Sequence, residues 1–310
     1  MDAPRREGED DMDYLEFHRE PPANLTTMVV GFGGWIDAGE AASGTMRHLV
    51  RRLSASHLAS IDPEEFFVFT QVRPSVRLTA EGIRAIRWPR SEFFSWQPSE
   101  GQPGLLLFRG MEPNRMWRTY TSLLLDLAEQ CGVKRIVSIG ALLAGLPHTR
   151  PPRVTGYSTD PEWQARLEDW GVYRRPTYQG PTGIASTVLD AATRRGMSHL
   201  SFMGQAPHYL QGAANPAVRQ ALLSYVTRLL DIPLDMSRLD EAVRAFRAQC
   251  DQAVAHDPST RAYVQQLEQE YDSEVGEAPR PLHDEDLNPD RLMRELEDFL
   301  REEREGGDES

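Results

Sequence analysis

The sequence holds a single lysine, Lys134, and two cysteines in 310 residues. A Walker A loop needs a lysine before Ser or Thr, and Schiff-base chemistry needs an accessible one. Lys134 stands at the polar start of an expected strand, which argues against both kinds of site. Cys131 and Cys250 form no metal-binding or disulfide spacing, and such sparse cysteine use is typical of the reducing cytoplasm. We therefore expect a cytoplasmic protein.

Long apolar runs and catalytic motifs are lacking as well. No stretch approaches the 18 or so apolar residues of a membrane-spanning helix, and the acidic residues before Met28 do not resemble a signal peptide. The eight histidines form no HExxH motif and no His/Cys cluster, and there is no G-x-S-x-G elbow. We expect no metal, no cofactor, no serine-hydrolase site and no membrane partner.

The net charge of -13 is concentrated at the two ends of the chain. Residues 1–20 hold eight acids and three arginines, and residues 271–310 hold fifteen acids and five arginines. The body between them is close to neutral, with no clustered basic face in the sequence. Nucleic acid is therefore not an expected partner.

From Thr27 onward, short apolar runs alternate with helical patterns. This alternation predicts an α/β fold, a three-layer αβα sandwich with a mostly parallel sheet. Segment 76–89 reads as a hairpin or an irregular edge segment. The expected strands are 28–32, 64–72, 104–110, 135–140, 153–158 and 199–204, and the expected helices are 37–53, 112–132, 160–171, 183–196 and 215–231.

The C-terminal part changes character. Residues 235–257 and 258–272 read as a helical hairpin, and 274–290 as an acidic flexible stretch. Residues 291–305 predict either a docking helix on a tether or a charged helix that frays. The expected divisions are an acidic N-terminal segment 1–24, an αβα core 25–233, a helical hairpin 234–273, and an acidic flexible tail 274–310 with a short amphipathic helix.

The first candidate site follows the first strand, in 28-MVVGFGGWIDAGEAAS-43. The dinucleotide fingerprint G-x-G-x-x-G fails because Ile36 takes the place of its last glycine. Glycines before a helix can still bind an anion through backbone N–H groups, but the Asp37 carboxylate would compete for those groups. A structural turn and a ligand loop therefore stay open for Gly31, Gly33 and Gly34. Trp35 is either an exposed contact residue or a lid over the core.

Two later loops also follow strands, where α/β sheets place their ligands. In the first, His148 and Arg150 stand among prolines; they suit a general base and an anion clamp, or else a rigid loop for packing or oligomer contact. The second contains His208 and Tyr209, for which the same alternatives hold. No nucleophile or carboxylate partner stands at a diagnostic spacing, so the residues alone define no reaction.

The three loops taken together, GFGGWIDAGEAAS, LLAGLPHTRPPRVTGYS and APHYLQGAANP, resemble the proteasome assembly chaperone family of the second-subunit type, in its bacterial, actinobacterial-like branch. The entry GPTGIASTVLDAATRRG is also similar, and the resemblance covers about residues 25–235. It implies a three-layer fold similar to the purine nucleoside phosphorylases, without established enzymatic activity. It also implies homo-oligomers, and proteasome α-type subunits as partners.

The chain departs from this family at its C-terminus. Members that dock onto the proteasome often end in a hydrophobic-Tyr-X motif, whereas this sequence ends in Gly-Asp-Glu-Ser. In place of tail docking, three alternatives stay open: binding through the body, binding through 291–305, and no binding to a proteasome at all.

The leading hypothesis is a non-enzymatic, oligomeric protein-interaction module that resembles these chaperones. The alternative is a small-molecule-binding protein or an enzyme of nucleoside-phosphorylase type. In it, the Gly31–Asp37 loop approaches phosphate, Arg150 clamps it, and Trp35 or Tyr209 stacks on a base. A third possibility is a scaffold whose acidic tail regulates a partner by charge.

Overall fold

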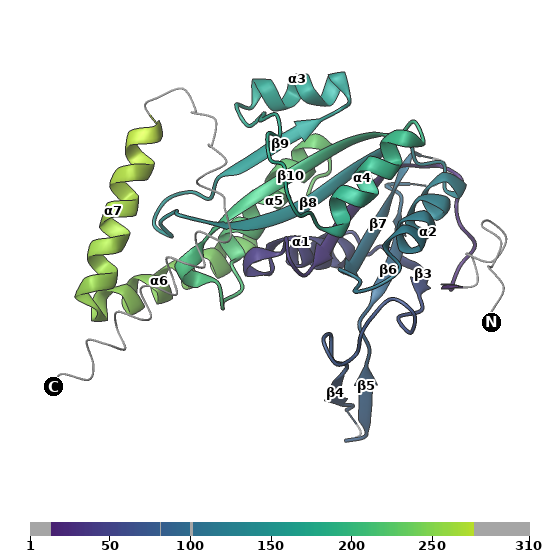
Figure 1. Cartoon of the computed structure of the whole chain (residues 1–310), viewed down its shortest axis with the longest axis horizontal. Coiled ribbons are helices and arrows are strands. Elements are labelled where there is room, and N and C mark those ends of the chain that lie inside the picture. The colour runs from purple at the N-terminus through teal and green to yellow at the C-terminus, as the bar shows by residue number, and fades with distance from the viewer. Residues whose placement is uncertain (1–13, 81, 100–101, 276–310) are drawn as a thin grey trace.

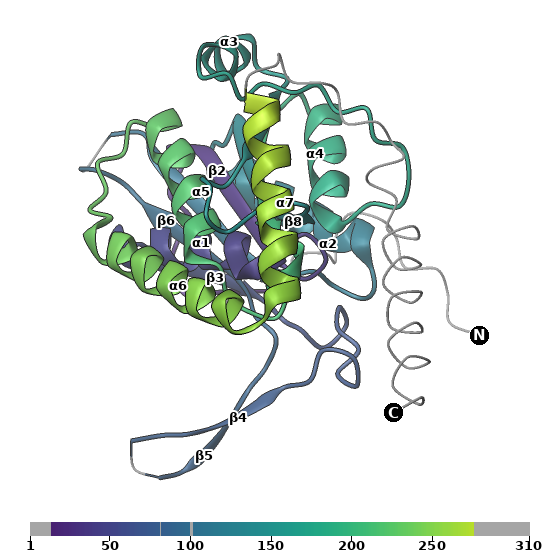
Figure 2. The same ribbon diagram turned by 90° about the vertical axis from the view of Figure 1, so that its left-hand side faces the viewer.

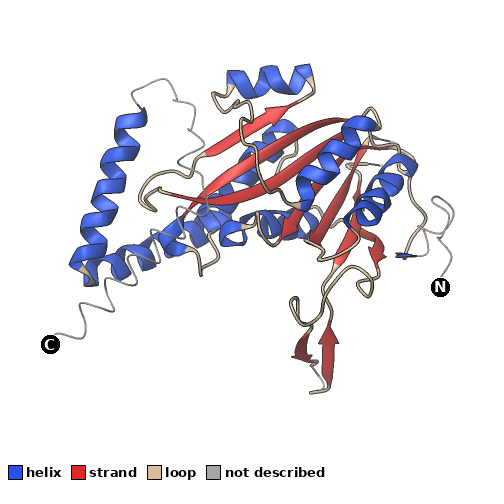
Figure 3. Cartoon of the chain, viewed as in Figure 1, coloured by secondary structure: helices blue, strands red, loops and turns tan. Residues whose placement is uncertain are grey.

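The computed structural model describes residues 14–80, 82–99 and 102–275 (Figure 1). One large sheet with helices on both faces forms the body, and two features project from it. These are a two-stranded hairpin and a pair of C-terminal helices (Figures 1 and 3).

The large sheet has eight strands, and its four central strands, β7, β2, β8 and β10, run parallel. The outer strands add in antiparallel fashion at both sides. The chain is therefore a mixed α/β protein with a large sheet that has a parallel centre. In spatial order the strands are β1 (Leu15–Phe17), β3 (Ser56–Ile61), β6 (Ser91–Trp96), β7 (Gly104–Met111), β2 (Leu25–Gly33), β8 (Arg135–Ala144), β10 (Ser198–Pro207) and β9 (Val154–Ser158).

Helices cover both faces of this sheet, as Figure 2 shows. Helices α1 (Ala41–Arg52) and α5 (Pro216–Leu229) pack on one face, and α2 (Trp117–Gln130) and α4 (Ile184–Arg194) on the other. Strand β2 divides its side chains between the two cores: Val30 faces α2 and α4, and Val29 faces α1 and α5. A strand buried on both faces reads as a continuous apolar run, which is why 28–32 was recognisable.

Two helix starts follow their capping sequences. The side chain of Asn215 accepts hydrogen bonds from the N–H groups of Ala217 and Val218, and Pro216 takes the first helical position of α5. Asp160 caps α3 (Pro161–Asp169) in the same way. Both starts lie where the sequence predicted them.

The strand expected at 64–72 is wrong. Phe66 and Phe67 are buried, but their segment forms turns. The backbone carbonyl of Phe66 accepts from the N–H groups of Asn114 and Arg115, and the Asn114 side chain accepts from the N–H of Val68. The loop after β7 thus satisfies the backbone groups that a strand would pair. Strands β1, β3 and β6, which the sequence did not predict, fill that side of the sheet.

The structure confirms a hairpin within 76–89: β4 (Ser75–Leu78) pairs with β5 (Arg84–Arg87) in a separate two-stranded sheet. Helices α6 (Ser237–His256) and α7 (Pro258–Val275) follow one another directly. They meet at Asp257 and diverge instead of lying side by side (Figures 1 and 2). The helix expected at 291–305 lies outside the described residues.

Candidate functional site

The candidate residues lie at the carboxyl edge of the parallel strands. Strands β2, β7, β8 and β10 end there at Gly33, Met111, Ala144 and Pro207. Strands β8 and β10 extend beyond β2 as a two-stranded ribbon, because β2 pairs with β8 only as far as Gly31 and Ile139. Residues 141–144, expected in a loop, therefore continue β8. In open α/β sheets this edge is where ligands and partners bind.

The glycines at the end of β2 and directly after it serve close packing and a turn. A Cβ at Gly31 would lie 2.5 Å from Cγ of Met46, so the missing side chain lets α1 approach the strand. Gly33 faces the Met111 sulfur in the same way. Gly34 has a φ of +127°, which glycine tolerates best. These contacts favour the turn over the ligand loop.

Asp37 occupies the N-terminus of α1, where an anion would bind. Its Oδ1 accepts the N–H of Ser43 at 3.0 Å. Glu40, the residue directly before α1, makes no side-chain capping bond and pairs with Arg47 at 2.6 Å. The Asp37 carboxylate thus competes for the helix N–H groups, as the sequence predicted. It does so from outside the helix, because the short 3-10 turn Ala38–Glu40 separates Asp37 from α1.

This burial predicts a pH dependence. Burial raises the pKa of Asp37 above its usual 3.8, although hydrogen bonds from Ser43 oppose the shift. Folding then favours the protonated carboxyl, so its contribution to stability is complete below pH 3.8 and is lost as pH rises through the folded-state pKa. Relative to Asp37→Asn, the native protein should lose stability in urea unfolding as the pH rises above about 4 and through the raised pKa of Asp37. A difference that is constant or grows with pH would contradict this assignment.

Glu112, which the sequence analysis missed, occupies the N-terminus of a second helix. It follows β7 directly; its Oε1 accepts the N–H of Ile184 at 2.8 Å, and its Oε2 lies 3.4 Å from the N–H of Trp35. Helix α4 begins at Ile184, and its N-cap, Gly183, has no side chain to cap it. A carboxylate from another strand therefore takes the position that a bound anion would take.

Substitution of Glu112 should expose this position. In Glu112→Ala, the N–H of Ile184 loses its partner, and we expect the free energy of unfolding to fall by about 1–2 kcal/mol. Inorganic phosphate should restore part of that loss, because an anion at the helix N-terminus replaces the carboxylate. The matched variant Glu112→Gln keeps an acceptor and should show no phosphate effect in thermal melts. Equal phosphate effects in both variants, or none in either, would refute the capping function.

Exposed apolar side chains lie on this capped loop and on the segments connected to it. Trp35 is 53% exposed, and Leu142 and Leu143 are 37% and 38% exposed. The N–H of Ala141 donates to the carbonyl of Ile36 at 2.8 Å, which fixes the Trp35 loop beside the end of β8. Exposed Tyr178 belongs to the loop that leads to Gly183, and Gly183 lies against Trp35. We call Trp35, Leu142, Leu143 and Tyr178 the apolar rim.

The structure joins His148 and Tyr209, two candidates that lie far apart in the sequence. The Tyr209 hydroxyl accepts the backbone N–H of His148 at 2.7 Å and lies 2.7 Å from its Nδ1. Nε2 of His148 lies 3.2 Å from Oδ1 of Asp251 on α6. The hydrogen bonds of all three groups are satisfied when Nδ1 of His148 accepts from Tyr209 and Nε2 donates to Asp251. Burial raises the pKa of Tyr209 to about 12, so near neutral pH this hydroxyl stays protonated.

Arg150 and His208 hold α7 against the same loops. Arg150 donates two hydrogen bonds to the Asp272 carboxylate, at 2.8 and 2.7 Å, and a third to Glu268 at 3.3 Å. His208 lies 3.0 Å from the Tyr263 hydroxyl of α7. The positive charge proposed as an anion clamp is therefore neutralised within the chain.

The nine candidates thus fall into two groups. His148, Arg150, His208 and Tyr209 converge beneath α6 and α7, while the Gly31–Asp37 loop packs on α1, Glu112 and α4. Among the described residues, no hydrogen bond or ring contact joins the two groups. The space beside His148 and Arg150 measures about 10 Å³, which is too small for more than one water. This arrangement does not provide the common phosphate cleft that the phosphorylase-type alternative requires.

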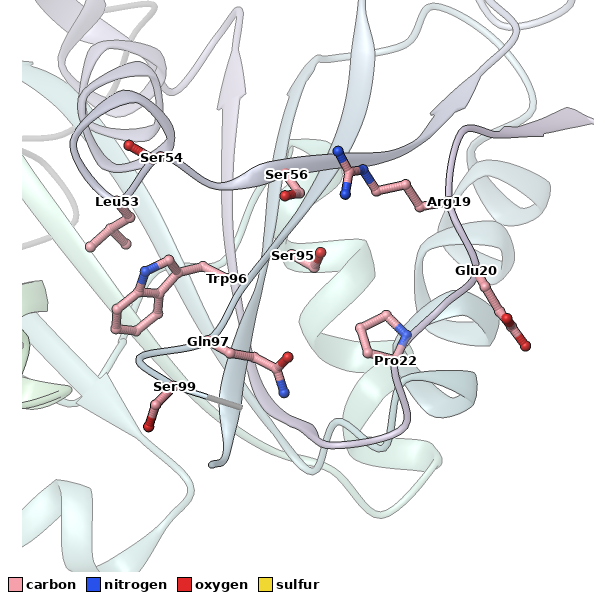
Figure 4. A pocket seen from close by; sticks show the side chains of 10 residues that line it. All are labelled: Arg19, Glu20, Pro22, Leu53, Ser54, Ser56, Ser95, Trp96, Gln97 and Ser99. Atoms are coloured by element: carbon pink, nitrogen blue, oxygen red, sulfur yellow. The ribbon is translucent and has the colours of Figure 1, made fainter. Parts of the chain in front are cut away.

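A larger hollow of about 720 Å³ lies at the opposite edge of the sheet. Figure 4 shows Leu53 and Trp96 on one side of it and Arg19, Glu20 and Pro22 on the other. Leu53 follows the end of α1, and Trp96 pairs with Leu105 at the start of β7, so the hollow opens at the amino ends of the strands. That is not the edge at which α/β sheets bind their ligands.

Within the described ranges, no group of three or more His, Cys, Asp or Glu side chains is arranged to hold a metal ion. A search of those same ranges finds no helix with the length and apolar character needed to cross a bilayer.

A protein-family model described as the PAC2 family matches residues 31–254, most of the chain. The chain belongs to the PAC2 family. The match begins at the first glycine of the β2 loop and ends within α6, so it includes all nine candidate residues and excludes α7. The resemblance carried by the three loops is thereby confirmed.

Solved structures agree with this membership. A PAC2 family protein from Streptomyces avermitilis is 36% identical, with a TM-score of 0.68, over 77% of this chain and 99% of that one. A Mycobacterium tuberculosis proteasome-assembly chaperone homologue is 31% identical, with a TM-score of 0.67, over 77% and 100%. PbaB of Pyrococcus furiosus, an archaeal proteasome activator, shares the fold at 19% identity and a TM-score of 0.63, over 77% and 97%. A search of curated proteins gave no match.

Proposed function

We propose that this PAC2 family member is a non-enzymatic, homo-oligomeric assembly chaperone of the cytoplasm that binds proteasome α-type subunits through the apolar rim. The observation that carries the proposal is that the carboxyl edge of the sheet has its helix N-termini already capped and its apolar side chains exposed. Asp37 and Glu112 satisfy the helix N-termini that an anionic substrate would need, and apolar side chains stand exposed beside them. An edge of this kind suits a protein surface better than a small anion.

The relatives support the choice of partner. Two solved structures that share the fold are a proteasome-assembly chaperone homologue and a proteasome activator. We extend that association with the proteasome to this chain, and we propose that its three-layer fold is similar to that of the purine nucleoside phosphorylases, as its loops implied.

The alternative of a nucleoside-phosphorylase-type enzyme loses its two anion-binding parts. The glycine loop is capped by Asp37, and Arg150 is bound to Asp272 and Glu268. No feature of the described residues favours it over protein binding.

The test mixes the purified full-length protein with proteasome α and β subunits of its own organism and measures co-elution by size exclusion with light scattering. Co-elution with α subunits or half-assembled particles, but not with mature core particles, is the expected result. The same run gives the oligomeric state of the free protein. Absence of any complex at micromolar concentrations would end the chaperone proposal.

A further inference from the structure

The β4–β5 hairpin projects from the body as an uncovered two-stranded ribbon (Figures 1 and 2). A hairpin of two strands has marginal stability in water unless something packs on it. Here the side chains are almost all exposed: Val76, Leu78, Ile83 and Ile86 are 51%, 71%, 65% and 59% exposed. A ribbon with so much apolar surface is typical of a docking element.

The strand register assigns the side chains of the hairpin to its two faces. Val76 lies directly opposite Ile86, and Leu78 is two residues from Val76, so these three share one face. Arg77 and Arg87 lie on the other face, where Arg77 is opposite Ala85. One face of the ribbon therefore combines these apolar side chains with Arg84, which is opposite Leu78, and the other, basic face carries Arg77 and Arg87.

The basic face is not neutralised by the rest of the described chain. Residues 73–90 contain five arginines and one acid, Glu81. Arg90 pairs with Glu92 at 3.1 Å, but no described carboxylate forms an ion pair with Arg77, Arg84 or Arg87. Burial and repulsion from Arg90 and Arg77 lower the pKa of Arg87. The near-neutral body expected from the sequence thus conceals a local basic cluster that the fold concentrates on one ribbon.

A partner for this ribbon must combine acidic and apolar side chains, and the chain itself contains such a segment. Residues 276–310 hold thirteen acids and five arginines. They also contain apolar residues spaced among the acids, namely Leu292, Leu296, Phe299 and Leu300. The acidic residues 1–13 have the charge without a comparable apolar set. Nucleic acid would complement only the arginines of the hairpin and not its apolar side chains. The net charge of -13 would also repel it.

We propose that the acidic C-terminal segment, residues 276–310, docks on the β4–β5 hairpin. Its leucines and Phe299 cover Val76, Leu78 and Ile86, and its carboxylates pair with the hairpin arginines. Helix α7 ends at Val275, and 35 further residues can extend over about 115 Å, well beyond the roughly 50 Å width of a compact domain of this size. The segment can therefore reach the hairpin of its own chain or that of a second copy.

The test cross-links the two elements in the full-length protein. Ala80→Cys in the hairpin turn and Met293→Cys in the segment are joined by a short bis-maleimide, while native Cys131 and Cys250 are buried. We expect efficient cross-linking at low salt and a loss of about tenfold in half-molar salt, because the contact is electrostatic at a surface. Peptide mass spectrometry then identifies the linked residues, and the mass of the product shows whether one chain or two are joined.

Charge variants decide between the proposal and chance contact. Arg77→Glu, Arg84→Glu and Arg87→Glu together should reduce the yield about tenfold, and Glu302→Arg, Glu303→Arg and Glu305→Arg should restore it. The matched control reverses three exposed arginines elsewhere, Arg118, Arg175 and Arg244, and should leave the yield unchanged.

A second variant, Val76→Ser with Ile86→Ser, tests the apolar face and should also reduce the yield. Equal yields in the hairpin triple variant and in the matched control would overturn the proposal. Preferential cross-linking of Ala80→Cys to Ala3→Cys in place of Met293→Cys would also overturn it. A third contrary result would be salt-sensitive binding of duplex DNA that the hairpin triple variant abolishes while cross-linking persists.

Discussion

Substitution of Trp35 by alanine is expected to weaken binding to α-type subunits about 100-fold, equal to about 2.7 kcal/mol, with stability changed by less than about 0.5 kcal/mol. Trp35 is 53% exposed, so its truncation removes contact area without opening a cavity in the core. The Glu112 carboxylate and the hydrogen bond between Ile36 and Ala141 hold the backbone of the loop that carries the indole. Exposed tryptophans held in this way are frequent anchors of protein interfaces.

Trp88 provides the matched control for this binding experiment. It is 45% exposed and packs on Phe69 at the base of the hairpin, away from the carboxyl edge. Trp88→Ala should therefore bind α-type subunits like the native protein in titrations by fluorescence anisotropy. Unaltered affinity in Trp35→Ala, or the same loss in both variants, would refute the apolar rim as the interface.

Replacement of His148 by alanine should lower the free energy of unfolding by about 3 kcal/mol. The side chain is almost fully buried and bonds Tyr209 and Asp251, so its removal leaves a cavity and a hydroxyl without its acceptor. Urea unfolding of His148→Ala, Tyr209→Phe and the double variant should show less than additive losses, because the two substitutions break one shared interaction.

Arg150→Ala distinguishes the attachment of α7 to the body from the stability of the core around His148. Its guanidinium reaches Asp272 and Glu268 at the surface, so the variant should speed hydrogen exchange in α7 while the global unfolding midpoint stays nearly unchanged. If Arg150→Ala loses as much global stability as His148→Ala, then α7 unfolds together with the core. That result would contradict the prediction that α7 opens separately.

The parallel centre of the sheet could be predicted because its strands are buried on both faces. Runs such as 104–110 and 135–140 are apolar at most positions and stand between helical patterns. The antiparallel side could not. Strands β3 and β6 contain serines and a histidine, and the more apolar segment 64–72 between them forms turns that bury Phe66 and Phe67. An apolar run without periodicity does not distinguish a strand from a buried turn.

The candidate site was predictable in its residues but not in its connections. The loops after the strands drew attention to Asp37, His148 and Arg150, yet Glu112 acts on a helix that begins 72 residues later. Likewise Arg150 meets Asp272 over a separation of 122 residues. No local pattern encodes such pairs, because only the packing of the fold brings their elements together. One signal was present: an acid directly after a buried strand, at the edge where α/β sheets place functional residues.

Hydrogen–deuterium exchange of the full-length protein, with and without α-type subunits, tests the central claim most directly. The account predicts that α subunits slow exchange in the Trp35–Asp37 loop, at Leu142 and Leu143, and around Tyr178, while the amino-edge hollow near Trp96 exchanges as before. Unchanged exchange at the apolar rim, in a sample where light scattering shows a complex, would contradict it.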